Sequence, residues 1–285
     1  MTLIKDWVQS YHPKTGIDLY NAKREIIQEI ILAGLNRGGF FKYAAFYGGT
    51  ALRIFYGLDR FSEDLDFSLL YKDPKFTIKS FLDTLIEEFN LIGLKVRTSI
   101  ESKKKNSDIE STFLKDDSEW SFIHIEDLET DRLFPTVKIK IEIDRDPPLG
   151  FLTEAKLLVR PYSFYVNILK REYLFAGKMH ALLFRQWKQN VKGRDWYDLQ
   201  WYITRGIELN MDHFRIRAAE SGHWQSDKPM NKNDLFQIYE KKVNRLELEM
   251  AKKDVLRFVE DKSKIEIWSK AYFLDLFTHL KIQEN

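Results

Sequence analysis

The sequence predicts an α+β fold in which a mixed sheet with flanking helices precedes a helical lobe. Two observations support this prediction. Patterns typical of strands and of helices are mixed up to about residue 165, and only helical patterns follow. With 44% hydrophobic and 14% aromatic residues, the composition is globular and excludes an intrinsically disordered chain. We therefore expect two domains, residues 1–165 and 166–285.

Hydrophobic periodicity defines the elements of the first half. Apolar residues recur at the helical period between Asp18 and Asn36, and Gly38-Gly39 ends that segment. The clearest strand runs from Val137 to Asp144, where apolar and charged residues alternate, so that one face of the strand is apolar. The predicted helices of this half cover residues 18–36, 50–56 and 76–89, and the predicted strands cover residues 43–47, 64–69, 94–100, 120–125 and 137–144.

Helical periodicity continues through the second half. The predicted helices cover residues 171–188, 196–205, 212–219, 233–245, 252–259 and 265–279. Basic residues outnumber acidic ones two to one between residues 170 and 217, although the formal net charge of the chain is only +2. Aromatic side chains cluster in the same stretch, at Trp187, Trp196, Tyr197, Trp201 and Tyr202. Their helical spacing favours core packing over stacking on a nucleobase.

Several classes of protein are excluded by what the sequence lacks. The chain contains no Cys, which rules out a disulfide framework, a thiolate zinc site and a cysteine nucleophile. The first residues show no basic segment followed by an apolar core, so we expect no signal peptide. No apolar run approaches the ~18 residues of a membrane span. We therefore expect a cytoplasmic protein without a membrane partner.

The residues that point to chemistry follow a short apolar strand. Gly48-Gly49-Thr50 comes first, and after a short predicted helix Asp64 and Asp66 lie two residues apart on a strand, where their side chains point to the same face. Two carboxylates held together repel each other, and a divalent cation such as Mg²⁺ or Mn²⁺ removes that repulsion. Because Mg²⁺ also binds substrate phosphates, the spacing favours a metal site for phosphoryl chemistry.

A third acid would complete a two-metal clamp for in-line displacement at phosphorus. Glu142 is the best candidate because it lies on the polar face of the next strong strand, and Asp144 on the same face is the alternative. The glycines of Gly48-Gly49-Thr50 would let the backbone approach a phosphate, and the helix that follows would offer free N–H groups. The Ser62 hydroxyl would either lie beside the metal or phosphate or cap a turn.

Together these motifs resemble those of a known family. The order from Gly48-Gly49-Thr50 to Asp64-Leu65-Asp66 is similar to the signature of the nucleotidyltransferase superfamily that includes DNA polymerase beta. The longer string from Phe61 to Phe67 (FSEDLDF) resembles the AbiEii/AbiGii-type branch, and so do Lys178 to Leu182 (KMHAL) and Lys192 to Leu199 (KGRDWYDL). The matching motifs run from about residue 47 to about residue 205.

The resemblance implies a nucleotidyltransferase fold and a function. Such a chain would be the toxin of a bacterial toxin–antitoxin or abortive-infection system. It would bind an NTP with Mg²⁺ and transfer a nucleotide to an acceptor hydroxyl. Some family members act on the acceptor end of tRNA, so the implied acceptor is an RNA 3′ end. The implied partner is an antitoxin that is encoded separately.

The resemblance also implies roles for single residues. Asp64 and Asp66 match the metal-binding acids of the family, and Lys178 matches its helix lysine. Asp195 and Asp198 fall in its Arg-Asp-x-Tyr-Asp segment. We therefore predict three overlapping sets: catalytic residues Asp64, Asp66, Glu142, Lys178, Asp195 and Asp198; nucleotide-binding residues Gly48, Gly49, Thr50, Ser62, Lys178 and Arg185; and metal ligands Asp64, Asp66 and Glu142.

The spacing of the second motif agrees with these roles. Lys178, Leu182 and Arg185 are spaced to share one helical face, where an ammonium would neutralise a triphosphate as a point charge. Asp195 stands at the start of the next predicted helix and would either cap that helix or orient Lys178.

Two other functions remain as alternatives at this point. A transferase with the same metal chemistry could modify a small molecule or a protein hydroxyl. A non-catalytic, nucleotide-binding regulatory protein could use the same fold. The intact pair of aspartates favours an enzyme over the second alternative.

Overall fold

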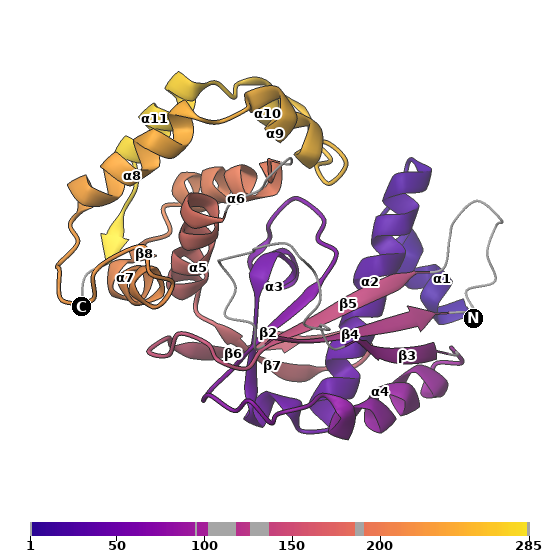
Figure 1. Ribbon diagram of the computed structural model, residues 1–285. Coiled ribbons are helices and arrows are strands. Elements are labelled where there is room, and N and C mark those ends of the chain that lie inside the picture. The colour runs from indigo at the N-terminus through magenta and orange to yellow at the C-terminus, as the bar shows by residue number, and fades with distance from the viewer. Residues whose placement is uncertain (1, 95, 102–117, 126–136, 186–190, 284–285) are drawn as a thin grey trace.

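The computed structural model describes residues 2–94, 96–101, 118–125, 137–185 and 191–283. These residues form a seven-stranded mixed sheet with strand order β3-β4-β5-β2-β1-β7-β6, which lies between N-terminal helices and a C-terminal helical lobe (Figure 1). The strands are β1 (Ala44–Tyr47), β2 (Leu65–Leu69), β3 (Val96–Glu101), β4 (Ser118–Ile125), β5 (Lys138–Asp144), β6 (Thr153–Leu158) and β7 (Phe164–Leu169).

The register of the central strands gathers polar side chains on one face of the sheet. β2 pairs with β1 in antiparallel and with β5 in parallel orientation, which places Tyr47 opposite Asp66, Asp66 opposite Glu142, and Ser68 opposite Asp144. Paired residues of adjacent strands share a face, so these side chains lie together. The apolar residues between them point to the other face and are buried.

Helices from the N-terminal part bury the apolar face of the sheet. α2 (Gly16–Arg37) packs against α4 (Lys79–Leu91), and both share one hydrophobic core with β1, β2, β5 and β7. α2 begins with a capping box, in which Thr15 accepts from the backbone N–H of Asp18 and Asp18 accepts from that of Thr15. α1 (Thr2–Gln9) and the 3₁₀-helix η1 (Phe40–Lys42) complete this layer.

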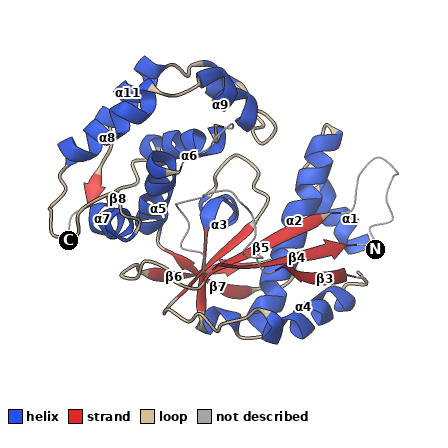
Figure 2. Cartoon of the chain, viewed as in Figure 1, coloured by secondary structure: helices blue, strands red, loops and turns tan. Residues whose placement is uncertain are grey.

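The polar face is turned toward α3 (Gly48–Tyr56) and the helical lobe (Figures 1 and 2). The lobe has its own core, rich in aromatic side chains, in which the ring of Phe175 stacks on that of Tyr202 at 4.3 Å. Across the described ranges, no helix is long and apolar enough to cross a membrane. The lobe contains α5 (Arg171–Phe184), α6 (Gly193–Thr204), β8 (Leu209–Asn210), α7 (Met211–Glu220), α8 (Lys232–Asn244), α9 (Leu248–Val255), α10 (Ser263–Glu266), α11 (Lys270–Thr278) and β9 (Ile282–Gln283).

The predicted α+β fold class is confirmed, with corrections to single elements. The helix expected over residues 171–188 ends at Phe184, because the backbone of Arg185 is extended with ψ of 128°. The helix expected over 265–279 is two helices, α10 and α11. β6 and β7 are not among the predicted strands. β6 is a half-exposed edge strand without a clear apolar alternation, whereas β7 alternates in burial over its first residues and was missed.

The aromatic residues of the basic stretch form part of the lobe core. Trp196, Tyr197, Trp201 and Tyr202 are all buried, which confirms the expectation of core packing. Trp187 lies outside the described residues.

Candidate active site

The candidate site begins where β1 continues directly into α3. Tyr47 ends β1 and caps α3, and Gly48 has a positive φ of 83°. A Cβ atom on Gly48 would collide with the carboxylate of Asp66, and one on Gly49 would come within 2.9 Å of a guanidinium nitrogen of Arg60. The sequence predicted that a phosphate approaches the backbone at these glycines. In the structure, the side chains of Asp66 and Arg60 lie close to them.

Asp64 and Asp66 lie at the N-terminal end of β2, beside this turn. Burial, together with the charges of Glu142 and Asp64, raises the pKa of Asp66 from 3.8 to about 7. Burial also raises the pKa of Asp64. Neither carboxylate forms an ion pair with any of the described residues. The two aspartates are therefore an anionic pair without a bound counter-charge.

Two further acids lie on the neighbouring strand β5. Glu142 is opposite Asp66 and accepts a hydrogen bond of 2.5 Å from Lys140. Asp144 lies two residues further along the same face, and burial raises its pKa although the charge of Arg217 opposes this. Both candidates for the third acid thus face the same side of the sheet as Asp66. We call Asp64, Asp66, Glu142 and Asp144 the acid face.

The chemistry of the acid face fits a hard divalent cation. Of the four acids, Glu142 is paired with Lys140, whereas Asp64 and Asp66 have no such partner among the residues that the structure describes. A divalent cation stabilises grouped carboxylates of this kind, and Mg²⁺ takes oxygen ligands from protein, water and substrate phosphates. Within the described ranges, however, no three His, Asp or Glu side chains are grouped closely enough to hold a metal on their own. Asp64, Asp66 and Glu142 would need phosphate or water oxygens as further ligands.

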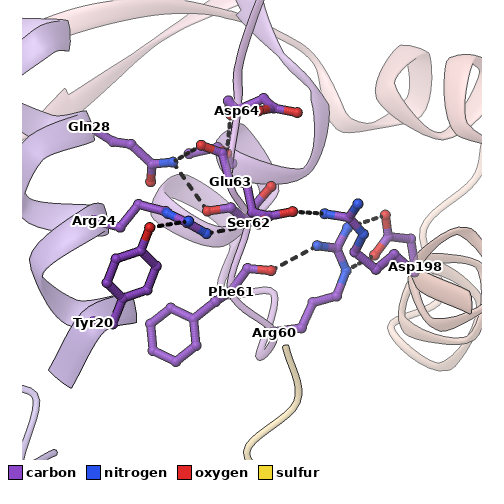
Figure 3. Close-up of polar contacts among 11 residues, drawn as sticks. Tyr20, Arg24, Gln28, Arg60, Phe61, Ser62, Glu63, Asp64 and Asp198 are labelled. Atoms are coloured by element: carbon purple, nitrogen blue, oxygen red, sulfur yellow. Dashed lines mark hydrogen bonds and ion pairs between the residues drawn. The ribbon is translucent and has the colours of Figure 1, made fainter. Parts of the chain in front are cut away.

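The loop of residues 57–64, which leads from α3 to Asp64, is held by α3 and α2 (Figure 3). The Thr50 hydroxyl donates to the backbone carbonyl of Asp64 at 2.5 Å. The amide of Gln28 donates to the carbonyls of Ser62 and Glu63 at 3.1 and 3.0 Å. Thr50 therefore positions the acid pair, and the hydrogen bonds of Gln28 fix the backbone on either side of Ser62.

The same loop is tied to α2 and α6 by ion pairs, of which the one between Arg60 and Asp198 is buried (Figure 3). Glu63 accepts from Arg24 of α2 at 3.1 Å and from Arg194 of α6 at 3.0 Å. Arg60 donates two hydrogen bonds of 2.6 Å to Asp198 of α6. Since the side chains of Arg60 and Asp198 are 2% and 0% exposed, this bidentate pair is shielded from solvent.

The charged residues of the second motif extend this network. Lys178 of α5 contacts Asp195 and Asp198, each at 2.9 Å. Although burial opposes it, the charges of Lys178 and Arg185 hold the pKa of Asp195 below its usual value. No side-chain cap is present on α6. Of the two roles expected for Asp195, the structure thus shows the one that orients Lys178.

Arg185 does not lie where the helical spacing placed it. Because α5 ends at Phe184, Arg185 follows the helix and is exposed instead of continuing the face of Lys178 and Leu182. Its charge nevertheless lowers the pKa of Asp66, so it lies in the same region.

Sequence reasoning missed Arg217 of α7. Its Nε atom is buried and has no hydrogen-bond partner, and burial lowers its pKa. The charges of Tyr47 and Asp144 instead raise the pKa of Arg217. No motif or spacing distinguishes Arg217 from other basic residues of the lobe, since only the fold brings α7 to the acid face.

Comparison with known proteins assigns the chain to a family. The family described as "Nucleotidyl transferase AbiEii toxin, Type IV TA system" matches residues 30–275. Because this match covers most of the sequence, the chain belongs to that family of nucleotidyltransferase toxins, which work with a cognate antitoxin.

One solved structure shows the same fold, and a second is less similar. JHP933 from Helicobacter pylori is similar with a TM-score of 0.51 and 20% sequence identity, over 91% of this chain and 89% of that one. A protein of H. pylori provisionally assigned as a nucleotidyltransferase is similar with a TM-score of 0.48 and 18% identity, over 90% and 92% of the two chains. No curated protein matches the sequence.

Proposed function

We propose that the chain is a metal-dependent nucleotidyltransferase that moves a nucleotide from an NTP to an acceptor hydroxyl, the 3′ end of an RNA such as tRNA. The observation that supports this most is the uncompensated pair of Asp64 and Asp66 beside the Gly48 turn. Grouped carboxylates with raised pKa values at a glycine turn are suited to binding a hard cation and a triphosphate together.

Asp64, Asp66 and Glu142 are the proposed ligands of Mg²⁺ or Mn²⁺. When bound, the cation would neutralise phosphate charge and align the α-phosphorus with its attacker. Its positive charge would also favour the ionised form of Asp66, whose pKa is otherwise near neutrality.

The triphosphate also needs cations that are not already paired. Lys178 is held by two carboxylates of α6. We therefore propose that Lys178 positions α6 and, through Asp198, the loop of residues 57–64. Arg185 and Arg217 pair with no carboxylate in the part of the chain that the structure describes, and they act on Asp66 and Asp144 respectively. We therefore assign the two guanidiniums to the β- and γ-phosphates.

The reaction balances without further groups. The acceptor hydroxyl gives its proton to a carboxylate of the acid face, and its oxygen forms a bond to the α-phosphorus. The bond from that phosphorus to the bridging oxygen breaks, and pyrophosphate leaves. We propose Asp144 as the proton acceptor, because burial raises its pKa toward the range of an effective general base, and Glu142 lies opposite the metal-binding Asp66.

Label transfer tests the proposal. Purified protein is incubated with Mg²⁺, total RNA and each NTP labelled at the α-phosphate. We expect label in RNA from at least one NTP, and a loss of about 1,000-fold or more in Asp66→Asn. Glu249→Gln, at a glutamate that is 86% exposed, is the matched control and should transfer normally. Full activity of Asp66→Asn would contradict the assignment.

The location of the label, together with a separate measurement of NTP binding, distinguishes the alternatives. If the label appears in protein or in a small molecule, the proposed RNA acceptor is wrong, but the proposed transferase activity is retained. Absence of Mg²⁺-dependent NTP binding by the wild-type chain would instead favour a regulatory protein on this fold.

The biological setting follows from the family. A type IV toxin–antitoxin system implies a cognate antitoxin. We propose that the antitoxin is encoded separately and that the toxin acts in the cytoplasm, where NTPs and tRNA are available.

A further inference from the structure

A concave region that includes Asp195 lies in the helical lobe. It is formed where the end of α5 meets the start of α6 and the end of α8, and its volume is about 640 Å³, within the range of ligand-binding pockets. We call it the α8 cleft. Its basic lining residues are Arg185, Lys192, Lys241, Lys242 and Arg245.

Most of these cations have no anionic partner. Arg185, Lys241, Lys242 and Arg245 form no ion pair with any carboxylate among the described residues. The ammonium of Lys242 donates to the backbone carbonyl of Arg185 at 3.1 Å, and burial lowers its pKa although the charge of Asp195 opposes this. Several like charges in one concave surface repel one another, so the cleft favours a ligand with several negative charges.

The acids of the cleft do not cancel this charge. The lining contains two acids, Asp195 and Glu247, against five basic residues, and Asp195 is already bonded to Lys178. The remaining wall is apolar, and Val191 and Ile238 are its half-buried residues. Cations next to an apolar wall suit a chain of phosphates that carries flat bases.

We propose that the α8 cleft binds the single-stranded 3′ segment of the acceptor RNA and leads it to the acid face. The inference rests on the proposed function, which requires an RNA acceptor. Phosphates of the strand pair with Lys241, Lys242 and Arg245, and its bases pack on the apolar wall. Arg185 connects the cleft with the acid face, since it lines the cleft and its charge also lowers the pKa of Asp66.

The position of the cleft favours RNA over the triphosphate of the NTP. The cations that act most strongly on Asp66 are Lys178 and Arg185. The charges that act on Lys242 are instead those of Asp195 and Arg245. Lys241, Lys242 and Arg245 line the cleft, whereas none of the four acids of the acid face does. A polymeric acceptor that extends from the acid face therefore suits the cleft better than a metal-bound triphosphate does.

Separate binding measurements on the two substrates test the inference. The variant is Lys241→Gln with Arg245→Gln, and the matched control is Lys253→Gln with Lys262→Gln, which removes the same charge from exposed positions outside the cleft. The probes are a fluorescent single-stranded RNA with a free 3′ hydroxyl and a non-hydrolysable NTP with Mg²⁺. Each dissociation constant is measured at several salt concentrations.

We expect the cleft variant to bind RNA about tenfold more weakly, with the slope of log K against log salt reduced by about 1.4 for two lost contacts. Its NTP affinity should equal that of the wild type, and the control should change neither. Unchanged RNA affinity would overturn the inference, as would absence of RNA binding by the wild type. An equal loss of NTP affinity would assign the cleft to the triphosphate instead.

The two proposals fail in different ways. If the cleft variant transfers label to RNA as well as the wild type does, the proposed role of the cleft is wrong and the transferase activity is retained. RNA binding that depends on the cleft, in a wild-type chain that transfers no label, would keep the cleft and reject the transferase.

Discussion

Asp66 shows how one residue is set up by its neighbours. The positive φ of Gly48 and its missing Cβ leave room for the carboxylate. Burial and the charges of Glu142 and Asp64 then raise its pKa to about 7. The protein thus keeps a carboxylate in a place that disfavours its charge, which is typical of a functional site and unfavourable for stability.

This tension predicts a stability change. The native state holds the proton of Asp66 more tightly than the unfolded chain does, so this group lowers the free energy of unfolding as the pH rises from about 4 to about 7. Asp66→Asn removes the titration. Three pKa units correspond to about 4 kcal/mol, and partial solvent exposure reduces this to roughly 2 kcal/mol. We expect Asp66→Asn to be more stable than the wild type by that amount at pH 8.

Urea unfolding at pH 4 to 8 measures this effect. The stability difference between Asp66→Asn and the wild type should grow with pH and level off above pH 7. Asp83→Asn, at an exposed residue of α4, should show no such growth. A difference independent of pH would mean that Asp66 is ionised normally in the folded protein.

Asp198 carries a different prediction, because it lies in the buried pair with Arg60. Asp198→Asn leaves the guanidinium of Arg60 without full compensation, which costs about 3–5 kcal/mol when one partner of a buried pair is removed. The double variant Arg60→Met with Asp198→Leu should lose less stability than Asp198→Asn, because it leaves no unpaired buried charge at this site. Denaturant unfolding of both variants decides this, and a single variant as stable as the wild type would contradict a structural role for Asp198.

At the scale of elements, Gly193 explains how α6 meets α9. A Cβ atom on Gly193 would collide with the backbone carbonyl of Ala251 in α9. The glycine in the KGRD string is therefore required for helix packing, a reason that the string alone does not reveal. This contact fixes the start of α6, which carries Arg194, Asp195 and Asp198 toward the loop and Lys178.

Gly193→Ala should therefore lower the free energy of unfolding by about 1–3 kcal/mol, since a backbone atom must move. Gly177→Ala is the matched control. It places a Cβ at an ordinary 3.8 Å from Arg217 and improves helix propensity, so it should leave stability unchanged or raise it. Thermal unfolding compares the two, and equal effects would show that α6 and α9 do not pack as described.

At the scale of the whole molecule, the periodic elements were predictable and the contacts between them were not. The alternation of Val137 to Asp144 predicted β5 because successive side chains of a strand point to opposite faces, so apolar residues mark the buried face and charged residues the other. The order of strands and helices predicted the α+β class for the same reason. The division at residue 165 stays a prediction, and that position falls inside β7.

The candidate site was predictable only where its residues are close in sequence. Gly48 and Asp66 belong to one strand–helix–strand unit, so a motif describes them together. The pairing of Lys178 with Asp198, the tie from Arg60 to α6 and the position of Arg217 depend on how the lobe docks on the sheet. No local pattern encodes that docking, and the assigned roles stay predictions until they are tested.

The central claim is that the acid face binds a divalent cation together with an NTP. Electron paramagnetic resonance of free Mn²⁺, titrated with protein and a non-hydrolysable NTP, tests it most directly. We predict that the wild-type chain binds Mn²⁺ and that Asp66→Asn binds it at least tenfold more weakly, a loss of about 1.4 kcal/mol or more. Equal Mn²⁺ affinity of the two proteins would contradict the account.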